Sequence, residues 1–210
     1  MVITKEELTK AETKYYKFFY QKRPKGKSYW VQIKQDDITK NQDACLEEGI
    51  FFAKETDVMQ WFKHGDTLAE IVFDKSHALH SKLQNEYFES SSGVCGNTVF
   101  ATNFISMNSD EMFQFIKAHY DIQQNGIEFL QGHLIFVRAF DTLEKLWEYK
   151  YSILGDAERA RDMHNAITLL KAYALNADLY RDINAEQIFN CNNWNELLTF
   201  VPKEKWILFE

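Results

Sequence analysis

The residues that could do metal chemistry are a pair of histidines and the thiol and acid nearest to them. His77 and His80 are three residues apart, so both imidazoles would lie on one face of a helix. With Cys95 or Glu86 they could bind zinc, which takes nitrogen, sulfur and oxygen ligands in sets of four. No fourth ligand is evident in the sequence. We therefore interpret the two histidines as a surface pair and predict no metal and no other cofactor.

Cys95 is the best-placed candidate nucleophile, because it stands between two glycines in a stretch that we predict to be a loop. No neighbouring residue would activate its thiol, and the sequence contains no complete set of residues for hydrolytic catalysis. The chain has three cysteines, which are far apart and form no CxxC pair. An odd number of scattered cysteines argues against a disulfide framework and fits a reducing, cytosolic setting.

A basic and aromatic stretch runs from Lys14 to Lys34 and contains no acidic residue. Such a surface could bind single-stranded nucleic acid, because lysines follow the phosphates while aromatic rings stack on the bases. The alternative is a β-hairpin whose rings face the core, and we prefer it because the whole chain is acidic. The residues of the candidate patch are Lys22, Arg23, Lys25, Lys27, Tyr29 and Trp30.

The formal net charge of the 210-residue chain is -7, and the acidic excess lies in its second half. Residues 1 to 107 carry 14 Lys and Arg against 15 Asp and Glu, whereas residues 108 to 210 carry 10 against 16. The electrostatic interaction of the second half with nucleic acid or with an anionic membrane is therefore expected to be unfavourable. The N-terminus lacks the features of a signal peptide, and no segment approaches the roughly 18 apolar residues of a membrane span. We predict no membrane association.

The elements that must position any site fall into two groups. Alternating and aromatic patterns predict strands before residue 107, whereas helical spacing dominates from residue 108 onward. The predicted strands cover 15–21, 29–34, 49–53, 67–73 and 98–107, with helices at 5–14, around Val58 to Phe62 and at 78–88. The later helices begin after Asn108 or Ser109, cover 127–151 with a break near Asp141, and continue at 156–175, 185–189 and, capped by Asn193, 194–200.

The predicted fold class is α+β, because strand-rich and helix-rich runs are segregated along the chain. We predict a mixed or antiparallel β-rich domain over residues 1–107 and an all-helical domain over residues 108–210. The most orderly segment, from Cys45 to Asp74, reads as strand, helix and strand. We expect Gly65 to end this helix as its left-handed cap.

About thirty residues of that segment resemble the core of ADP-ribosyltransferases of the poly(ADP-ribose) polymerase type. The matching parts are Gly49 to Ala53, the helix that follows and Leu68 to Val72. The resemblance implies that Phe51 and Phe62 stand where the family has NAD-contacting tyrosines. Glu70, Glu86 or Glu89 could then be the catalytic acid, and the resemblance does not choose among them. Since the two hydroxyl groups and the upstream His-Gly pair of the family are missing, the resemblance implies a shared fold more than a shared reaction.

The same region also resembles the N-terminal domain of giant-virus ankyrin-repeat proteins. The matching stretches are Tyr16 to Phe18, Gly49 to Ala53, Trp61 to Gly65 and Ala69 to Val72. The resemblance implies that helical repeats follow. The second half lacks the T-P-L-H signature and a clear period of about 33 residues, so a degenerate repeat array and an unrelated helical bundle both stay open.

Three functions remain from the sequence. The first, which we favour, is a non-catalytic protein-interaction protein of viral or mobile-element origin that acts on a host protein in the cytosol. The second is an ADP-ribosyltransferase-like enzyme or degenerate NAD binder that uses Phe51, Phe62 and Glu70. The third is a single-stranded nucleic-acid binder that uses the hairpin from Lys14 to Lys34.

Overall fold

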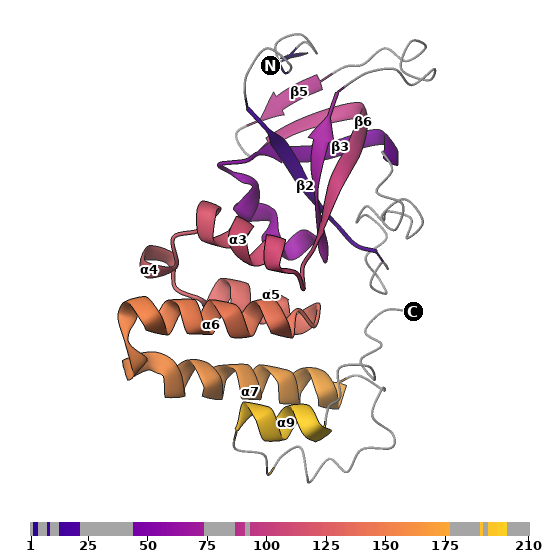
Figure 1. The fold of residues 1–210 in the computed structure, drawn as a ribbon. Helices are drawn as coiled ribbons and strands as arrows, with labels where there is room; N and C mark the ends of the chain where they lie inside the picture. Colours follow the sequence, from indigo (N-terminus) through magenta and orange to yellow (C-terminus); the bar gives the residue numbers. More distant parts are fainter. Residues whose placement is uncertain are drawn as a thin grey trace. The chain divides into compact units, whose positions relative to one another are not determined.

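The computed structural model describes residues 2–3, 8, 13–21, 44–73, 87–90, 93–176, 190 and 193–200. These residues form two compact units, one up to Ser106 and the other from Met107 onward. Strands make up most of the first unit and helices the second (Figure 1). The predicted α+β class is therefore confirmed.

The β unit is an antiparallel sheet that closes on itself. Its strands are β1 (Val2–Ile3), β2 (Tyr15–Phe19), β3 (Ala44–Lys54), β4 (Thr67–Val72), β5 (Tyr87–Ser90) and β6 (Gly93–Ser106). The strand order is β1-β5-β6-β3-β2-β4, and β6 also pairs with β4. The strands β6, β3, β2 and β4 therefore pair in a ring, as in a small barrel.

Strand β2 is buried on both of its faces. On one face Tyr15 packs edge-on against Phe52 of β3, with ring centroids 5.6 Å apart. On the other face Phe18 packs against Phe62 of the short 3-10 helix η1 (Val58–His64), at 5.5 Å. Alternation along a strand sends successive side chains to opposite faces. The run of aromatic residues in β2 therefore serves two packing layers at once.

Gly65 ends η1, but not in the left-handed conformation that we predicted. Its φ of -175° and ψ of 173° are extended, a conformation open to any residue. The glycine is needed for space, because a Cβ atom here would collide with the backbone of Phe19. The prediction that the helix ends at Gly65 is confirmed, whereas the predicted left-handed conformation of Gly65 is wrong.

The helical unit contains seven described helices. They are α3 (Asp110–His119), α4 (Ile122–Asn125), α5 (Glu128–Phe136), α6 (Phe140–Leu154), the 3-10 helix η2 (Asp156–Glu158), α7 (Arg159–Asn176) and α9 (Trp194–Phe200). Two predicted caps are confirmed. The Ser109 hydroxyl accepts a hydrogen bond from the Met112 amide at 3.2 Å, and the Asn193 amide oxygen accepts one from the Glu196 amide at 2.8 Å.

The predicted break in the helical run lies a few residues too late in the chain. The chain turns between α5 and α6, where Arg138 has a φ of 61°, and α6 already contains Asp141. The amide of Asp141 donates to the side chain of Asn108 at 2.9 Å. A residue distant in sequence thus caps α6, which local patterns cannot reveal.

Two local predictions in the β unit are wrong. Tyr87 and Phe88 belong to strand β5 rather than to a helix, and Cys95 lies in strand β6 rather than in a loop. Phe88 pairs with Cys95 across the two strands, so pairing with β6 overrides the helical pattern. The predicted strand at 29–34, the helix at 185–189 and most of the helices at 5–14 and 78–88 lie outside the described residues.

Candidate functional site

The three residues proposed for an NAD pocket lie in different environments. The side chain of Phe51 is 49% exposed, whereas that of Phe62 is fully buried against Phe18. Glu70 of β4 accepts a hydrogen bond from the Asn103 amide group at 2.9 Å. Phe62 therefore faces the core rather than an open cleft, and the structure does not bring the two phenylalanines together.

The six residues of the candidate basic patch, from Lys22 to Trp30, lie outside the described residues. The first part of the same stretch is described, and its rings at Tyr15, Tyr16, Phe18, Phe19 and Tyr20 are buried. Rings in the core cannot stack on nucleic-acid bases. The described part of the stretch thus matches the hairpin alternative in placing its rings inward.

The histidines and cysteines give no assembled metal site among the described residues. His77, His80 and Glu86 lie outside them, and no group of three or more His, Cys, Asp or Glu within them could hold a metal ion. At the end of η1, burial and the charge of Lys17 lower the pKa of His64.

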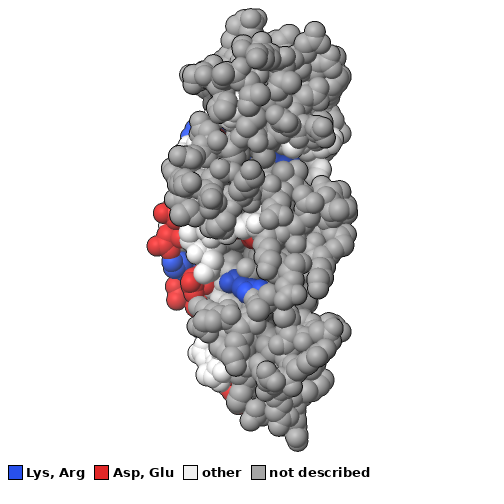
Figure 2. Space-filling model, turned by 90° about the vertical axis from the view of Figure 1, so that its right-hand side faces the viewer, with Lys and Arg blue, Asp and Glu red and all other residues white. Residues whose placement is uncertain are grey.

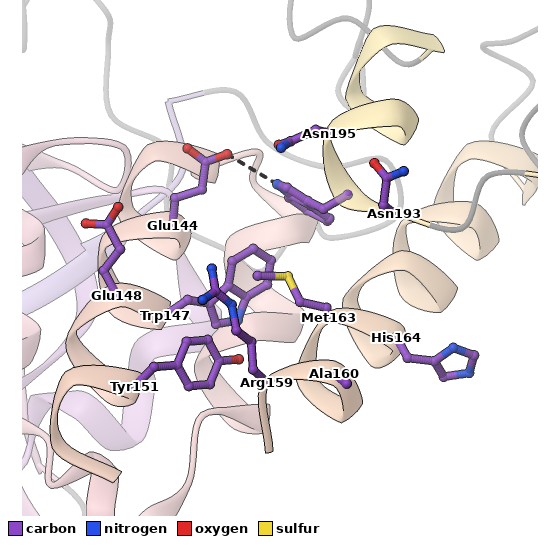
Figure 3. A pocket seen from close by; sticks show the side chains of 11 residues that line it. Glu144, Trp147, Glu148, Tyr151, Arg159, Ala160, Met163, His164, Asn193 and Asn195 are labelled. Atoms are coloured by element: carbon purple, nitrogen blue, oxygen red, sulfur yellow. Dashed lines mark hydrogen bonds between the residues drawn. The ribbon is translucent and has the colours of Figure 1, made fainter. Parts of the chain in front are cut away.

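A pocket of about 660 Å³ in the helical unit is the best-built candidate site. It lies between α6, α7 and the start of α9 (Figure 3), and we call it the helical pocket. Its lining residues are Glu144, Trp147, Glu148 and Tyr151 from α6, Arg159, Ala160, Met163 and His164 from α7, and Asn193, Trp194 and Asn195.

Aromatic side chains form the wall of the helical pocket. Trp147 and Trp194 pack edge-on, with ring centroids 5.0 Å apart, and both are almost completely buried. The indole N–H of Trp194 donates to Glu144 Oε1 at 3.2 Å (Figure 3). This hydrogen bond joins α9 to α6, so a carboxylate and an aromatic ring hold each other in place at the pocket.

Buried hydrogen bonds fix the positions of two aromatic side chains of this wall. The indole N–H of Trp147 donates to the side chain of Gln131 at 3.0 Å, and Gln131 donates to the backbone oxygen of Asp162 at 3.3 Å. The Tyr151 hydroxyl donates to Asp162 Oδ2 at 3.2 Å. Each polar end of these two rings therefore has a partner, and these hydrogen bonds hold the rings in one geometry. The other carboxylate oxygen of Asp162, Oδ1, is buried without a hydrogen-bond partner among the described residues.

The centre of this network is an ion pair between Lys150 and Asp162. Their side chains are 2% and 1% exposed and lie 2.6 Å apart. Burial alone would lower the pKa of Lys150, but hydrogen bonds to Asp162 and Glu158 outweigh it and raise that pKa. Burial and the nearby Asp162 charge raise the pKa of Tyr151. Tyr151 therefore stays a neutral hydroxyl donor at physiological pH.

Charged side chains of both signs surround the helical pocket. Glu144 and Glu148 line it from α6 and Arg159 from α7. Figure 2 shows acidic and basic groups side by side along the left edge of one face of the molecule. Glu148 is exposed and has no ion-pair or hydrogen-bond partner among the described residues. It also borders a second pocket of about 490 Å³ between α3 and α6. A carboxylate is thus available to a ligand at the rim.

The lining residues are suited to recognising a cation. The indole rings of Trp147 and Trp194 are buried, so the ring that contacts a cation here is that of Tyr151. The carboxylates of Glu144 and Glu148 can form charge-assisted hydrogen bonds with ammonium and guanidinium groups. The described lining contains no Ser, Thr, Cys or Lys. Two carboxylates and the Tyr151 ring give the helical pocket groups that can bind a cation.

The helical pocket was not predicted from the sequence, although its α6 face leaves a local signal. Glu144, Trp147, Glu148 and Tyr151 follow a spacing of three, four and seven residues, which places them on one face of a helix. A helix face that mixes carboxylates with large aromatic rings is unusual for a plain core stripe. The contributions of α7 and α9 could not be read in the same way, because they depend on tertiary packing.

None of the helices among the described residues combines the length and hydrophobicity that a bilayer span requires. The two family resemblances of the β unit remain predictions. No protein-family model, curated protein sequence or solved structure matches this chain.

Proposed function

We propose that the protein is a non-catalytic protein-interaction protein whose helical unit binds a basic segment of a partner protein in the helical pocket. The observation that carries this proposal is the joint placement of Trp147, Tyr151 and Trp194 with Glu144 and Glu148 around one pocket. Buried hydrogen bonds support the rings, so the site is pre-organised. Pre-organisation raises affinity because less conformational entropy is lost on binding.

The choice of a basic partner follows from charge complementarity. The helical half of the sequence has six more acidic than basic residues, 16 against 10, which attracts cationic segments at long range. At short range the free carboxylate of Glu148 and the neighbouring rings supply the contacts. Aromatic residues are also the commonest anchors of protein interfaces.

The origin of the partner is part of the proposal. The resemblance to giant-virus ankyrin-repeat proteins supports a viral or mobile-element origin and therefore a host protein as partner, met in the cytosol. The described residues add no specific observation in favour of NAD or nucleic-acid binding, so we do not carry those two functions further.

The test is selection of peptides from a random displayed library on the whole protein, followed by titration of the selected peptides. We expect enrichment of Arg and Lys, and an affinity about tenfold weaker for the double variant Glu144→Gln and Glu148→Gln. The matched control is Glu111→Gln with Glu128→Gln, which removes the same charge from helices outside the helical pocket. Selected peptides without basic residues, or equal losses in the two double variants, would contradict the proposal.

A further inference from the structure

We infer that Arg159 is an internal occupant of the helical pocket and that an arginine of the partner replaces it on the ring of Tyr151. This inference rests on the proposed function, and it assigns the ligand class and a built-in competitor to the same site. The guanidinium carbon of Arg159 lies 5.4 Å from the centre of the Tyr151 ring, within the range of a cation–π contact.

Arg159 stands where the 3-10 helix η2 continues into α7. It is the first residue of α7, and its amide donates to the backbone oxygen of Asp156. The helix dipole disfavours a positive charge near this end, whereas the ion pair with Asp156 favours it. The contact with the Tyr151 ring is a second favourable interaction of the guanidinium group.

Arg159 is held weakly, so its replacement by an arginine of the partner costs little free energy. Among the described residues it forms one ion pair, to Asp156 at 3.6 Å, and the two side chains are 57% and 75% exposed. Exposed pairs of this kind contribute little stability. No ion pair between Arg159 and Glu144 or Glu148 is found among the described residues. A guanidinium group of the partner could therefore take the place of Arg159 on the Tyr151 ring and also contact these carboxylates.

A second cation–π contact involves Tyr149, which lines the second pocket on the α3 side of α6. Lys117 of α3 lies 4.9 Å from the centre of the Tyr149 ring and 5.3 Å from that of Phe113. Both tyrosines of this part of α6 thus carry a cation from a neighbouring helix. The contacts of Arg159 and Lys117 are the model for a cationic ligand on a tyrosine ring. Lys117 also supplies a matched control outside the helical pocket.

The experiment compares binding of a blocked Ala-Ala-Arg-Ala-Ala peptide by the whole protein and its Arg159→Ala and Arg159→Gln variants. The indole N–H signals of Trp147 and Trp194 report binding in an NMR titration. We expect both variants to bind the peptide about three- to tenfold more tightly than the parent protein. A peptide with neutral citrulline in place of arginine should gain nothing, and Lys117→Ala should leave the affinity reported by the two indole signals of the helical pocket unchanged.

The outcomes separate this inference from the proposed function. Unchanged or weaker binding by both Arg159 variants would overturn the inference, while a loss in the Glu144→Gln and Glu148→Gln double variant would leave the proposed function standing. An arginine peptide that shifts neither indole signal in any variant at millimolar concentration would overturn both. An equal gain with citrulline would show that Arg159 only blocks space, which also contradicts the exchange of one cation for another.

Discussion

At the scale of single residues, the buried carboxyl group of Asp66 links stability to pH. Its Oδ1 accepts hydrogen bonds from the Gln21 amide at 2.9 Å and from the Thr67 hydroxyl at 3.0 Å. Burial nevertheless raises its pKa from 3.8 to about 6, although these hydrogen bonds act in the opposite direction. The carboxyl group of Asp66 therefore holds its proton more tightly in the folded state than in the unfolded chain.

The pH dependence follows from that preference. The stabilisation from Asp66 is fully present below pH 3.8 and is lost as the pH rises through about 6. We predict that Asp66→Asn, which keeps the acceptor oxygen without the charge, raises the free energy of unfolding at pH 7 by roughly 2 kcal/mol. The variant should also flatten the pH dependence between pH 4 and pH 6. Urea denaturation at a series of pH values measures both effects.

Asp57→Asn is the control, because Asp57 precedes η1 without forming a side-chain cap. It should change the free energy of unfolding by less than about 0.5 kcal/mol. A loss of stability in Asp66→Asn at pH 7, with the pH dependence intact, would show that the ionised carboxylate is needed.

At the scale of elements, the sequence predicts well what neighbouring residues determine. Ser109 and Asn193 cap α3 and α9 as expected, because a cap is a contact within four residues of one chain segment. The alternation in β4 is local in the same way. Asn108 was also considered as a cap of α3, but it binds the first turn of α6 instead. Such a contact between residues 33 positions apart leaves no local pattern.

The end of η1 gives a prediction that separates steric from conformational roles of glycine. We expect Gly65→Ala to destabilise the β unit by roughly 1–3 kcal/mol, because the new methyl group would collide with the Phe19 backbone. The control is Gly132→Ala in α5, where a Cβ atom would meet nothing within 4 Å. That change should stabilise its helix by roughly 0.5–1 kcal/mol. Hydrogen exchange, read by mass spectrometry for each unit, measures both variants, and a neutral Gly65→Ala would refute the steric account.

At the scale of the whole molecule, segregation of strands and helices was enough to predict the fold class. The closed ring of β6, β3, β2 and β4 was not predictable, because β6 pairs with three different strands along its length. The helical pocket was hidden for a related reason. Its α6 face could be read from spacing, whereas Arg159 and Trp194 reach it only through the packing of α7 and α9.

The same organisation predicts where binding activity resides in the chain. All residues that line the helical pocket, and the buried network behind it, come after Met107. We therefore expect a fragment of residues 107–210 to be helical by circular dichroism and to bind the arginine peptide within about twofold of the whole protein. Raising NaCl from roughly 50 to 500 mM should weaken both by a similar factor of about three, because exposed glutamates are screened. A folded fragment that has lost more than about tenfold in affinity would place part of the binding site in the β unit instead.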